Sequence, residues 1–259
     1  MNPQDSFVWT RLRPGSFWVR RRKVVLGNTL PFLLNILKST GRYDAFDLNW
    51  QPIYNCKPAT WPVPKHLFWD SDIGTWIEGL SYFGDLDDGD NSVLDQAAKD
   101  LLKKIEKAQQ PDGYLNIHFT VVTPKERFSN LRDLHELYNA GHLIESALAH
   151  QLRFETDEFM RPMEKYVELL HRTFGRGEGQ IRGYPGHPEI ELALIGLHKR
   201  RGDEKALELA KYFITERGNP SGVHGRHFYD VEAETRGENE HMMPAYYPGA
   251  RSYRYVMGL

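Results

Sequence analysis

Two histidines stand seven residues apart in the segment 135–142, and their spacing first invites comparison with a metal-dependent protease. His135 is followed by Glu136, but a zinc protease needs a second histidine at position 139, where this sequence has Asn139. His142 would lie about 10.5 Å from His135 along a helix axis, which is too far for both rings to bind one ion. The pattern therefore does not predict a metalloprotease.

The same side chains, together with Tyr138, fall on one face of a helix. They make a polar and aromatic stripe in a segment that is otherwise rich in leucine, isoleucine and alanine. Such a stripe can line a polar cavity that binds a small ligand. A solvated helix face is the alternative, and the spacing does not distinguish the two.

Two further segments bring carboxylates and aromatic rings to the start of a helix. Acidic residues at this place can cap free backbone N–H groups and meet the positive end of the helix dipole. Aromatic rings beside carboxylates are also common where proteins bind sugars. Both roles stay open for the residues in question, which are Asp70, Asp72, Trp76, Tyr184, His187, Glu189 and Glu191.

Helices must position these side chains, because apolar residues recur with a 3.6-residue period through most of the chain and alternating strand patterns are scarce. The sequence therefore predicts an all-α fold with about seven helices. They are expected over residues 17–40, 70–83, 92–108, 131–154, 157–174, 188–201 and 204–217.

A shift of 46 residues superposes one helical hairpin on the next. It places Ile144-Glu145 on Ile190-Glu191, and Asp157-Glu158 on Asp203-Glu204, where an aspartate is expected to cap the second helix of each hairpin. A less regular earlier copy carries Ile77-Glu78. Helical hairpins of this kind stack into an open solenoid or close into a ring, such as the six-hairpin (α/α)6 toroid. We expect part of such a toroid, incomplete and with apolar edges exposed.

The composition excludes several classes of partner. Lys plus Arg number 33 and Asp plus Glu number 35, so no broad positive field would attract nucleic acid. No apolar run is long enough to span a membrane, and residues 1–14 lack the apolar stretch of a secretory signal, so the expected location is cytoplasmic. The single cysteine, Cys56, cannot form an intrachain disulfide or a zinc site with several thiolates.

Several motifs follow one another in a characteristic order and carry a family resemblance. They are FWDSD (68–72), WIE (76–78), DGYLN (112–116), NLRD (130–133), HELY (135–138), GHLIE (141–145), the segment 183–194, YDVEA (229–233) and YRY (253–255). Together they resemble glycoside hydrolase family 127, typified by β-L-arabinofuranosidases with an (α/α)6 catalytic domain.

The resemblance implies a hydrolase that removes terminal β-L-arabinofuranose, with a cysteine nucleophile in a zinc-thiolate site and a glutamate as acid/base. It also implies that the histidines matching His142 and His187 contact the sugar. These two are the first candidates for substrate binding. A second group consists of His135, Asp70, Asp72, Trp76, Tyr184, Glu189 and Glu191.

Nothing in this chain matches the acid/base, the zinc cysteines or the nucleophile that the resemblance implies. We therefore expect a single domain over residues 1–259, with 1–15 as a loose arm, that stops before the catalytic residues. Such a chain would bind an arabinofuranoside carbohydrate, hold no zinc and show negligible hydrolysis. The alternatives are a non-catalytic sugar-binding pseudoenzyme and a helical-repeat scaffold for protein partners, and exposed helical edges could support an oligomer.

Overall fold

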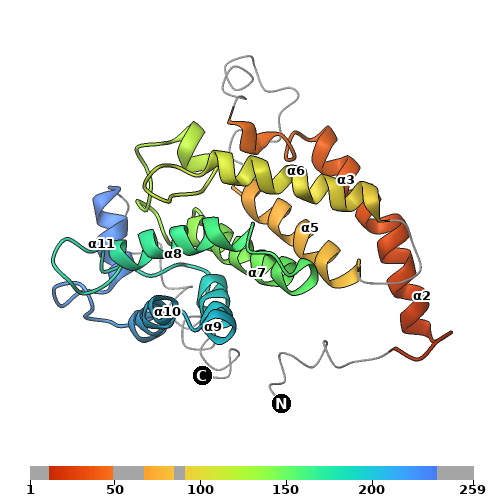
Figure 1. Cartoon of the computed structure of the whole chain (residues 1–259). Helices are drawn as coiled ribbons and strands as arrows, with labels where there is room; N and C mark the ends of the chain where they lie inside the picture. Colours follow the sequence, from red (N-terminus) through yellow and green to blue (C-terminus); the bar gives the residue numbers. More distant parts are fainter. Residues whose placement is uncertain (1–11, 49–66, 85–90, 238–259) are drawn as a thin grey trace.

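The computed structural model describes residues 12–48, 67–84 and 91–237, and within them it is helical (Figure 1). These residues form no β-strand, only isolated bridges between Phe174 and Ile181 and between Val223 and Arg226. The predicted all-α class is confirmed. The longer helices from residue 69 onward are α5 (Trp69–Phe83), α6 (Ser92–Ala108), α7 (Glu136–Phe154), α8 (Met160–Thr173), α9 (Glu189–Arg201) and α10 (Glu204–Glu216).

The helix expected over 17–40 is present as three consecutive helical pieces. Helix α2 (Phe17–Val24) passes through a π-helical turn, η2 (Val25–Thr29), into α3 (Leu30–Ser39). The hydroxyl of Ser16 starts this helix by accepting the N–H of Val19 at 3.3 Å. The helical prediction is correct, but it did not include the π-helical turn in the middle.

The two hairpins predicted by the 46-residue repeat are α7 with α8, and α9 with α10. Ile144 and Ile190, which the repeat superposes, are both fully buried. Between α9 and α10 the chain turns at Gly202, whose left-handed φ of 69° favours glycine. Asp203 then caps α10 as predicted, since its carboxylate accepts the N–H of Ala206 at 3.0 Å.

Two helix starts differ from the prediction. The helix expected from residue 131 begins at Glu136, because His135 adopts a left-handed conformation with φ of 54°. The helix expected from residue 157 begins at Met160. Asp157 does not cap it, and its carboxylate instead accepts the side-chain amide of Gln151 at 2.6 Å. The predicted capping role is therefore wrong at Asp157.

Three short elements were not predicted. They are the 3-10 turn η3 (Ala45–Asp47), the π-helical turn η4 (His118–Val122) and the helix α11 (Phe228–Thr235). Each is too short to show a repeated apolar period. The ring of His227 caps α11, because its Nδ1 accepts the N–H of Tyr229 at 3.2 Å.

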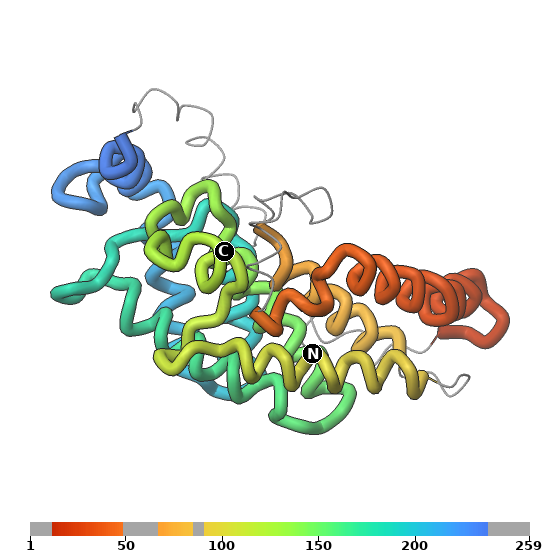
Figure 2. Tube along the Cα trace, turned by 90° about the horizontal axis from the view of Figure 1, so that it is seen from above, coloured from red at the N-terminus to blue at the C-terminus, as the bar shows by residue number. Residues whose placement is uncertain are grey.

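Helix α7 lies at the centre of the arrangement and contacts both α5 and α9. Helices α3 and α6 pack against α5, while α8 contacts α7 and α10 (Figure 1). The first and last described helices, α2 and α11, lie at opposite ends of the molecule (Figure 2). The described residues thus form an open arc of packed helices, and the toroid of which they would be part stays a prediction.

One edge of this arc is apolar, as the sequence predicts. On α3, the side chains of Phe32, Leu33 and Ile36 are 61%, 41% and 40% exposed. None of the described helices has the length and apolar character needed to cross a membrane. The cytoplasmic location stays a prediction.

A buried ion pair joins the last hairpin to the loop that follows it. The guanidinium of Arg217, directly after α10, donates from Nε to Glu191 of α9 at 2.9 Å. Both side chains are almost completely buried. The same guanidinium lies 5.6 Å from the ring of Tyr184. Removing either charge would leave the other without its counterion in a low-dielectric environment.

We therefore expect Glu191→Ala to lower the free energy of unfolding by about 3–5 kcal/mol. The control is Glu168→Ala, which removes a glutamate from a surface ion pair with Lys205 and should cost at most about 1 kcal/mol. Urea denaturation followed by circular dichroism measures both changes. Equal decreases in the free energy of unfolding of the two variants would show that the buried ion pair stabilises the fold no more than the surface pair does.

Candidate functional site

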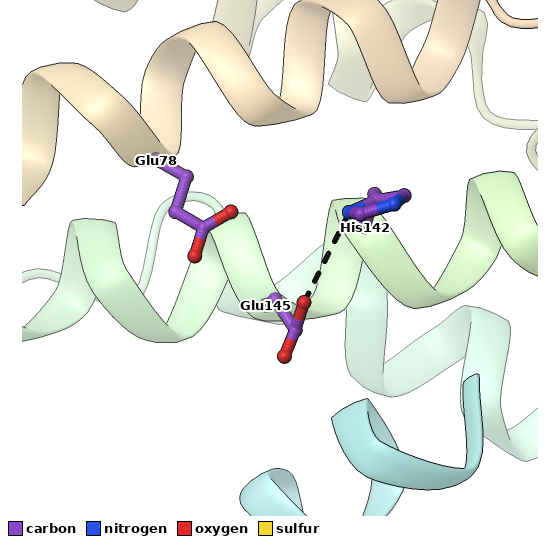
Figure 3. Close-up of side chains that lie close together, drawn as sticks. All are labelled: Glu78, His142 and Glu145. Carbon is purple, nitrogen blue, oxygen red and sulfur yellow. Dashed lines mark ion pairs between the residues drawn. The ribbon is translucent and has the colours of Figure 1, made fainter. Parts of the chain in front are cut away.

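Three acidic or imidazole side chains from two neighbouring helices converge in Figure 3. Glu78 comes from α5, and His142 and Glu145 come from α7, where their i and i+3 positions share one face. One possible ligand atom from each residue lies within 4.8 Å of the others. A fourth residue, Glu189 at the start of α9, has its Oε1 3.5 Å from Nδ1 of His142. We call these four residues the carboxylate cluster.

Two glycines allow the helices that carry this cluster to approach each other. A Cβ at Gly141 would lie 2.8 Å from the backbone nitrogen of Ile190 and 2.8 Å from Cγ of Glu189. A Cβ at Gly74 would lie 3.2 Å from the carbonyl oxygen of His142. Without a side chain at Gly141, the start of α9 packs directly onto α7 and brings Glu189 to His142.

Burial dominates the electrostatics of the cluster. It raises the pKa of Glu145 to about 9, and a hydrogen bond with Glu189 and the charges of Glu189 and Glu78 act in the same direction. Burial, assisted by the charge of Glu189, raises the pKa of Glu78 to about 7. It also lowers the pKa of His142, although Glu189 opposes this shift. The ring of His142 is therefore neutral near pH 7, and its contact with Glu189 is not a strong ion pair.

An aromatic row borders the cluster on α7. The ring of Tyr138 lies 4.4 Å from that of His142, 4.9 Å from His187 and 5.6 Å from His135, in each case edge to face. Phe68, just before α5, contacts both His135 and Tyr138 at 5.1 and 5.8 Å. The structure thus brings together His142 of α7 and His187 of the loop before α9.

The ring nitrogens of this row have defined roles. Nδ1 of His187 accepts the N–H of Glu189 at 3.2 Å, so the neutral ring carries its proton on Nε2. Nδ1 of His135 lies 2.7 Å from the carbonyl oxygen of Asp133 and is therefore the donor in that contact. Burial lowers the pKa of His187 as it does that of His142. Both candidate sugar-contacting rings are neutral hydrogen-bonding groups near pH 7.

Asn139, which the helical stripe included, turns toward the protein interior. Its carbonyl oxygen accepts the N–H of Ser71 at 3.1 Å, and its amide donates to the carbonyl oxygens of Leu67 and His135. It joins the start of α5 to the start of α7. The polar stripe is therefore partly structural.

Two candidates near the start of α5 are buried and serve the fold. Both carboxylate oxygens of Asp70 accept the N–H of Ile117, at 3.2 and 3.1 Å, and burial raises the pKa of Asp70 to about 7. The indole N–H of Trp76 donates to the carbonyl oxygen of Leu30 at 3.1 Å. These contacts within the protein explain the burial of Asp70 and Trp76, and no ligand is needed to pair their polar groups.

Among the remaining candidates, Tyr184 and Glu191 are also buried. The hydroxyl of Tyr184 forms a 3.0 Å hydrogen bond with Nε2 of His227, and Glu191 is the partner of Arg217 described above. Asp72 differs, since its carboxylate is partly exposed and pairs with Arg42 at 2.6 Å. Whether any of these residues contacts a sugar stays a prediction.

Glu78 and Glu145 are not among the site residues predicted from the sequence. A signal was present, because the 46-residue repeat superposes Glu145 on Glu191, and the earlier copy carries Glu78 at the same place. A glutamate that returns at one position of each hairpin is expected to face one side of the stack. The repeat could therefore have indicated a shared acidic surface.

The contact at Gly141 predicts that one added methyl group lowers stability there but not at Gly79. Gly141→Ala should lower the free energy of unfolding by about 1–3 kcal/mol, because the new Cβ would collide with backbone atoms of α9. The control is Gly79→Ala, whose Cβ would meet only Cδ2 of Leu30 at 3.6 Å. That variant should be neutral or up to about 1 kcal/mol more stable, since alanine favours the helix. Thermal unfolding compares the two, and a stable Gly141→Ala would refute the close approach of α9.

The raised pKa values predict a dependence of stability on pH. A carboxyl group with a higher pKa in the folded chain binds its proton more tightly when folded, so stability is present at low pH and is lost as pH rises. For Glu145 the range runs from its ordinary value of 4.5 to about 9. Glu78, Asp70 and Glu136 act in the same direction, with pKa values raised to about 7, 7 and 8 mainly by burial.

We therefore expect the free energy of unfolding to fall as pH rises from about 5 to about 9. Glu145→Gln removes one titrating group and should make this fall smaller. Glu126→Gln removes a charge from an exposed position and serves as the control. Urea denaturation in metal-free buffers at several pH values measures the profiles. An unchanged pH profile for Glu145→Gln would contradict a proton held by the cluster.

Comparison with known proteins gives a consistent relationship. The family model described as the beta-L-arabinofuranosidase, GH127 catalytic domain, matches residues 10–245. A non-reducing end beta-L-arabinofuranosidase of Bifidobacterium longum subsp. longum is 31% identical over 221 residues. That match covers 78% of this chain and 33% of the Bifidobacterium protein.

Solved structures agree. The GH127 β-L-arabinofuranosidase Ara127N-Se of Geobacillus stearothermophilus T6 superposes with a TM-score of 0.77 at 36% identity, over 89% of this chain and 36% of that one. The GH127 β-arabinofuranosidase BT3674 gives a TM-score of 0.70 at 27% identity, over 95% and 42%. The chain spans between 33% and 42% of the length of these relatives. With a family match over most of its length, the chain belongs to glycoside hydrolase family 127.

Proposed function

We propose that this chain forms the sugar-binding portion of a glycosidase that acts on terminal β-L-arabinofuranosides, and that by itself it does not hydrolyse them. The observation that carries the proposal is the meeting of His142 and His187 around Tyr138, in a chain of family 127. These are the two histidines for which the family resemblance implies contact with the sugar. His142 lies on α7 and His187 in the loop before α9, and the fold brings both rings to Tyr138.

The chemistry of the row suits a neutral, hydroxyl-rich ligand. A neutral imidazole offers one donor and one acceptor nitrogen. This suits sugar hydroxyls, because each hydroxyl can both donate and accept a hydrogen bond. Burial favours the neutral form of His142 and His187, and the ring of Tyr138 provides an apolar surface beside them. A small number of polar groups beside aromatic surface is typical of small-molecule sites.

The zinc-thiolate group that the resemblance implies does not fit this chain. The sequence has a single cysteine, Cys56, which lies outside the described residues, so several thiolates cannot meet here. We assign no hydrolytic step to the residues present. The proposal for this chain is therefore binding and orientation of the sugar, with bond cleavage dependent on groups that these residues do not supply.

The scaffold alternative has less support. A repeat protein that ends in a free edge needs a polar terminal face, whereas α3 presents Phe32, Leu33 and Ile36 to the surface. A non-catalytic sugar-binding protein remains compatible with the same geometry. Binding and turnover must therefore be measured separately.

The test uses p-nitrophenyl β-L-arabinofuranoside with the full chain. We expect saturable binding by calorimetry, weakened at least about tenfold in His142→Ala and in His187→Ala, because each variant loses hydrogen bonds made in a partly buried site. Release of p-nitrophenol should not exceed the uncatalysed rate.

The control is His171→Ala, which removes a histidine from a partly exposed pair with Glu208 and should leave binding unchanged. Circular dichroism confirms that each variant is folded. Absence of saturable binding by the folded chain, or equal affinity in all variants, would contradict the proposed sugar site. Turnover by the pure chain would contradict the proposed lack of hydrolysis.

A further inference from the structure

The carboxylate cluster contains more carboxyl groups than the surrounding basic side chains can pair. Among the described residues, no lysine or arginine forms an ion pair with Glu78, Glu145 or Glu189, and His142 is the one basic side chain within 4 Å of a carboxylate oxygen of Glu145 or Glu189. The internal repeat makes the contrast clear. Glu191 occupies the same repeat position as Glu145, and there Arg217 supplies the counterion. Glu78 and Glu145 occupy the same repeat position, but no arginine of the described residues forms an ion pair with them.

The cluster also contains polar atoms without a hydrogen-bond partner. Nδ1 of His142 and Oε1 of Glu189 are both inaccessible to solvent and unpaired, although they lie 3.5 Å apart. Atoms of this kind are rare in folded proteins, because each costs its lost hydration. An imidazole nitrogen with a lone pair and several carboxylate oxygens around one point are the donors that a divalent cation would satisfy.

We propose that Glu78, His142 and Glu145 bind a divalent transition-metal ion. One ligand atom from each of the three lies within 4.8 Å of the others, and Nδ1 of His142 is 3.9 Å from Oε2 of Glu145. A tetrahedral zinc site with bonds of about 2.0–2.2 Å holds its ligand atoms roughly 3.3 Å apart. Small movements of the glutamate side chains would reach that spacing. Glu189 adds negative charge beside the ion.

The donor set identifies the class of ion. Two carboxylates and one imidazole suit Zn²⁺, Mn²⁺ or Fe²⁺, while Ca²⁺ and Mg²⁺ prefer sites made of oxygen alone. This site contains no sulfur, so it differs in chemistry from the zinc-thiolate group that the family resemblance implies. It uses residues of α5 and α7 that are present in this chain.

Coordination through Nδ1 would also fix the proton of His142. The neutral ring would then carry its proton on Nε2, which becomes a hydrogen-bond donor of fixed orientation. In this respect the metal site would complement the proposed sugar contact of His142. The metal proposal does not depend on sugar binding, because the ligands and the ion suffice to test it.

The experiment titrates the chelator-treated full chain with Zn²⁺ by calorimetry and with Co²⁺ by visible absorption. We expect one ion per chain at this site. Glu78→Gln and Glu145→Gln keep the size of the side chain, and each should weaken Zn²⁺ binding at least about tenfold. The matched control is Glu208→Gln, which alters a more exposed glutamate that also faces a histidine, His171, at 2.9 Å. Its affinity should equal that of the unaltered chain.

X-ray absorption of the Zn²⁺ complex of the unaltered chain gives a readout that needs no variant. Oxygen and nitrogen ligands with one imidazole support the site, whereas a sulfur ligand would assign the ion to Cys56 and overturn it. A folded chain that binds no Zn²⁺ would also overturn the proposal, as would equal binding by all variants. None of these outcomes bears on arabinofuranoside binding, which is measured without metal.

Discussion

The close contact between α7 and α9 at Gly141 is the constraint on which the rest of the site depends. Hairpins of a helical stack bury their apolar faces only against their neighbours, so the distance between adjacent helices decides what their polar residues can reach. Here the missing side chain at Gly141 lets Ile190 and Glu189 come within contact of α7. A larger residue would separate the helices and move Glu189 away from His142.

This packing has an electrostatic consequence. Burying Glu78, Glu145 and Glu189 beside one neutral histidine favours protonated acids or a bound cation, because ionised carboxylates lose hydration when buried. The same repeat position in the next hairpin shows the other solution, in which Glu191 pairs with Arg217. The same repeat position thus holds a buried glutamate in two settings. Glu191 has its counterion in Arg217, whereas Glu78 and Glu145 would need a proton or a bound cation.

The family relationship and the open arc agree with each other. The chain spans roughly a third of the length of its relatives, and its described helices run from α2 to α11 without closing into a ring. The exposed apolar side chains of α3 lie at one edge of that arc. His142 and His187, the proposed sugar contacts, both lie within the described residues, whereas the thiolate chemistry implied by the resemblance would need more cysteines than the single Cys56 of this sequence.

The sequence by itself determined the helical class, most helix ranges, the repeated hairpins and the family, because apolar period and motif order are local properties of the chain. It did not determine that α7 starts after a left-handed His135, or that Asp70 and Trp76 would be buried in hydrogen bonds to distant backbone groups. Only the tertiary structure brought Glu78 to Glu145. That meeting depends on how closely helices pack, which is set by contacts between residues far apart in the chain.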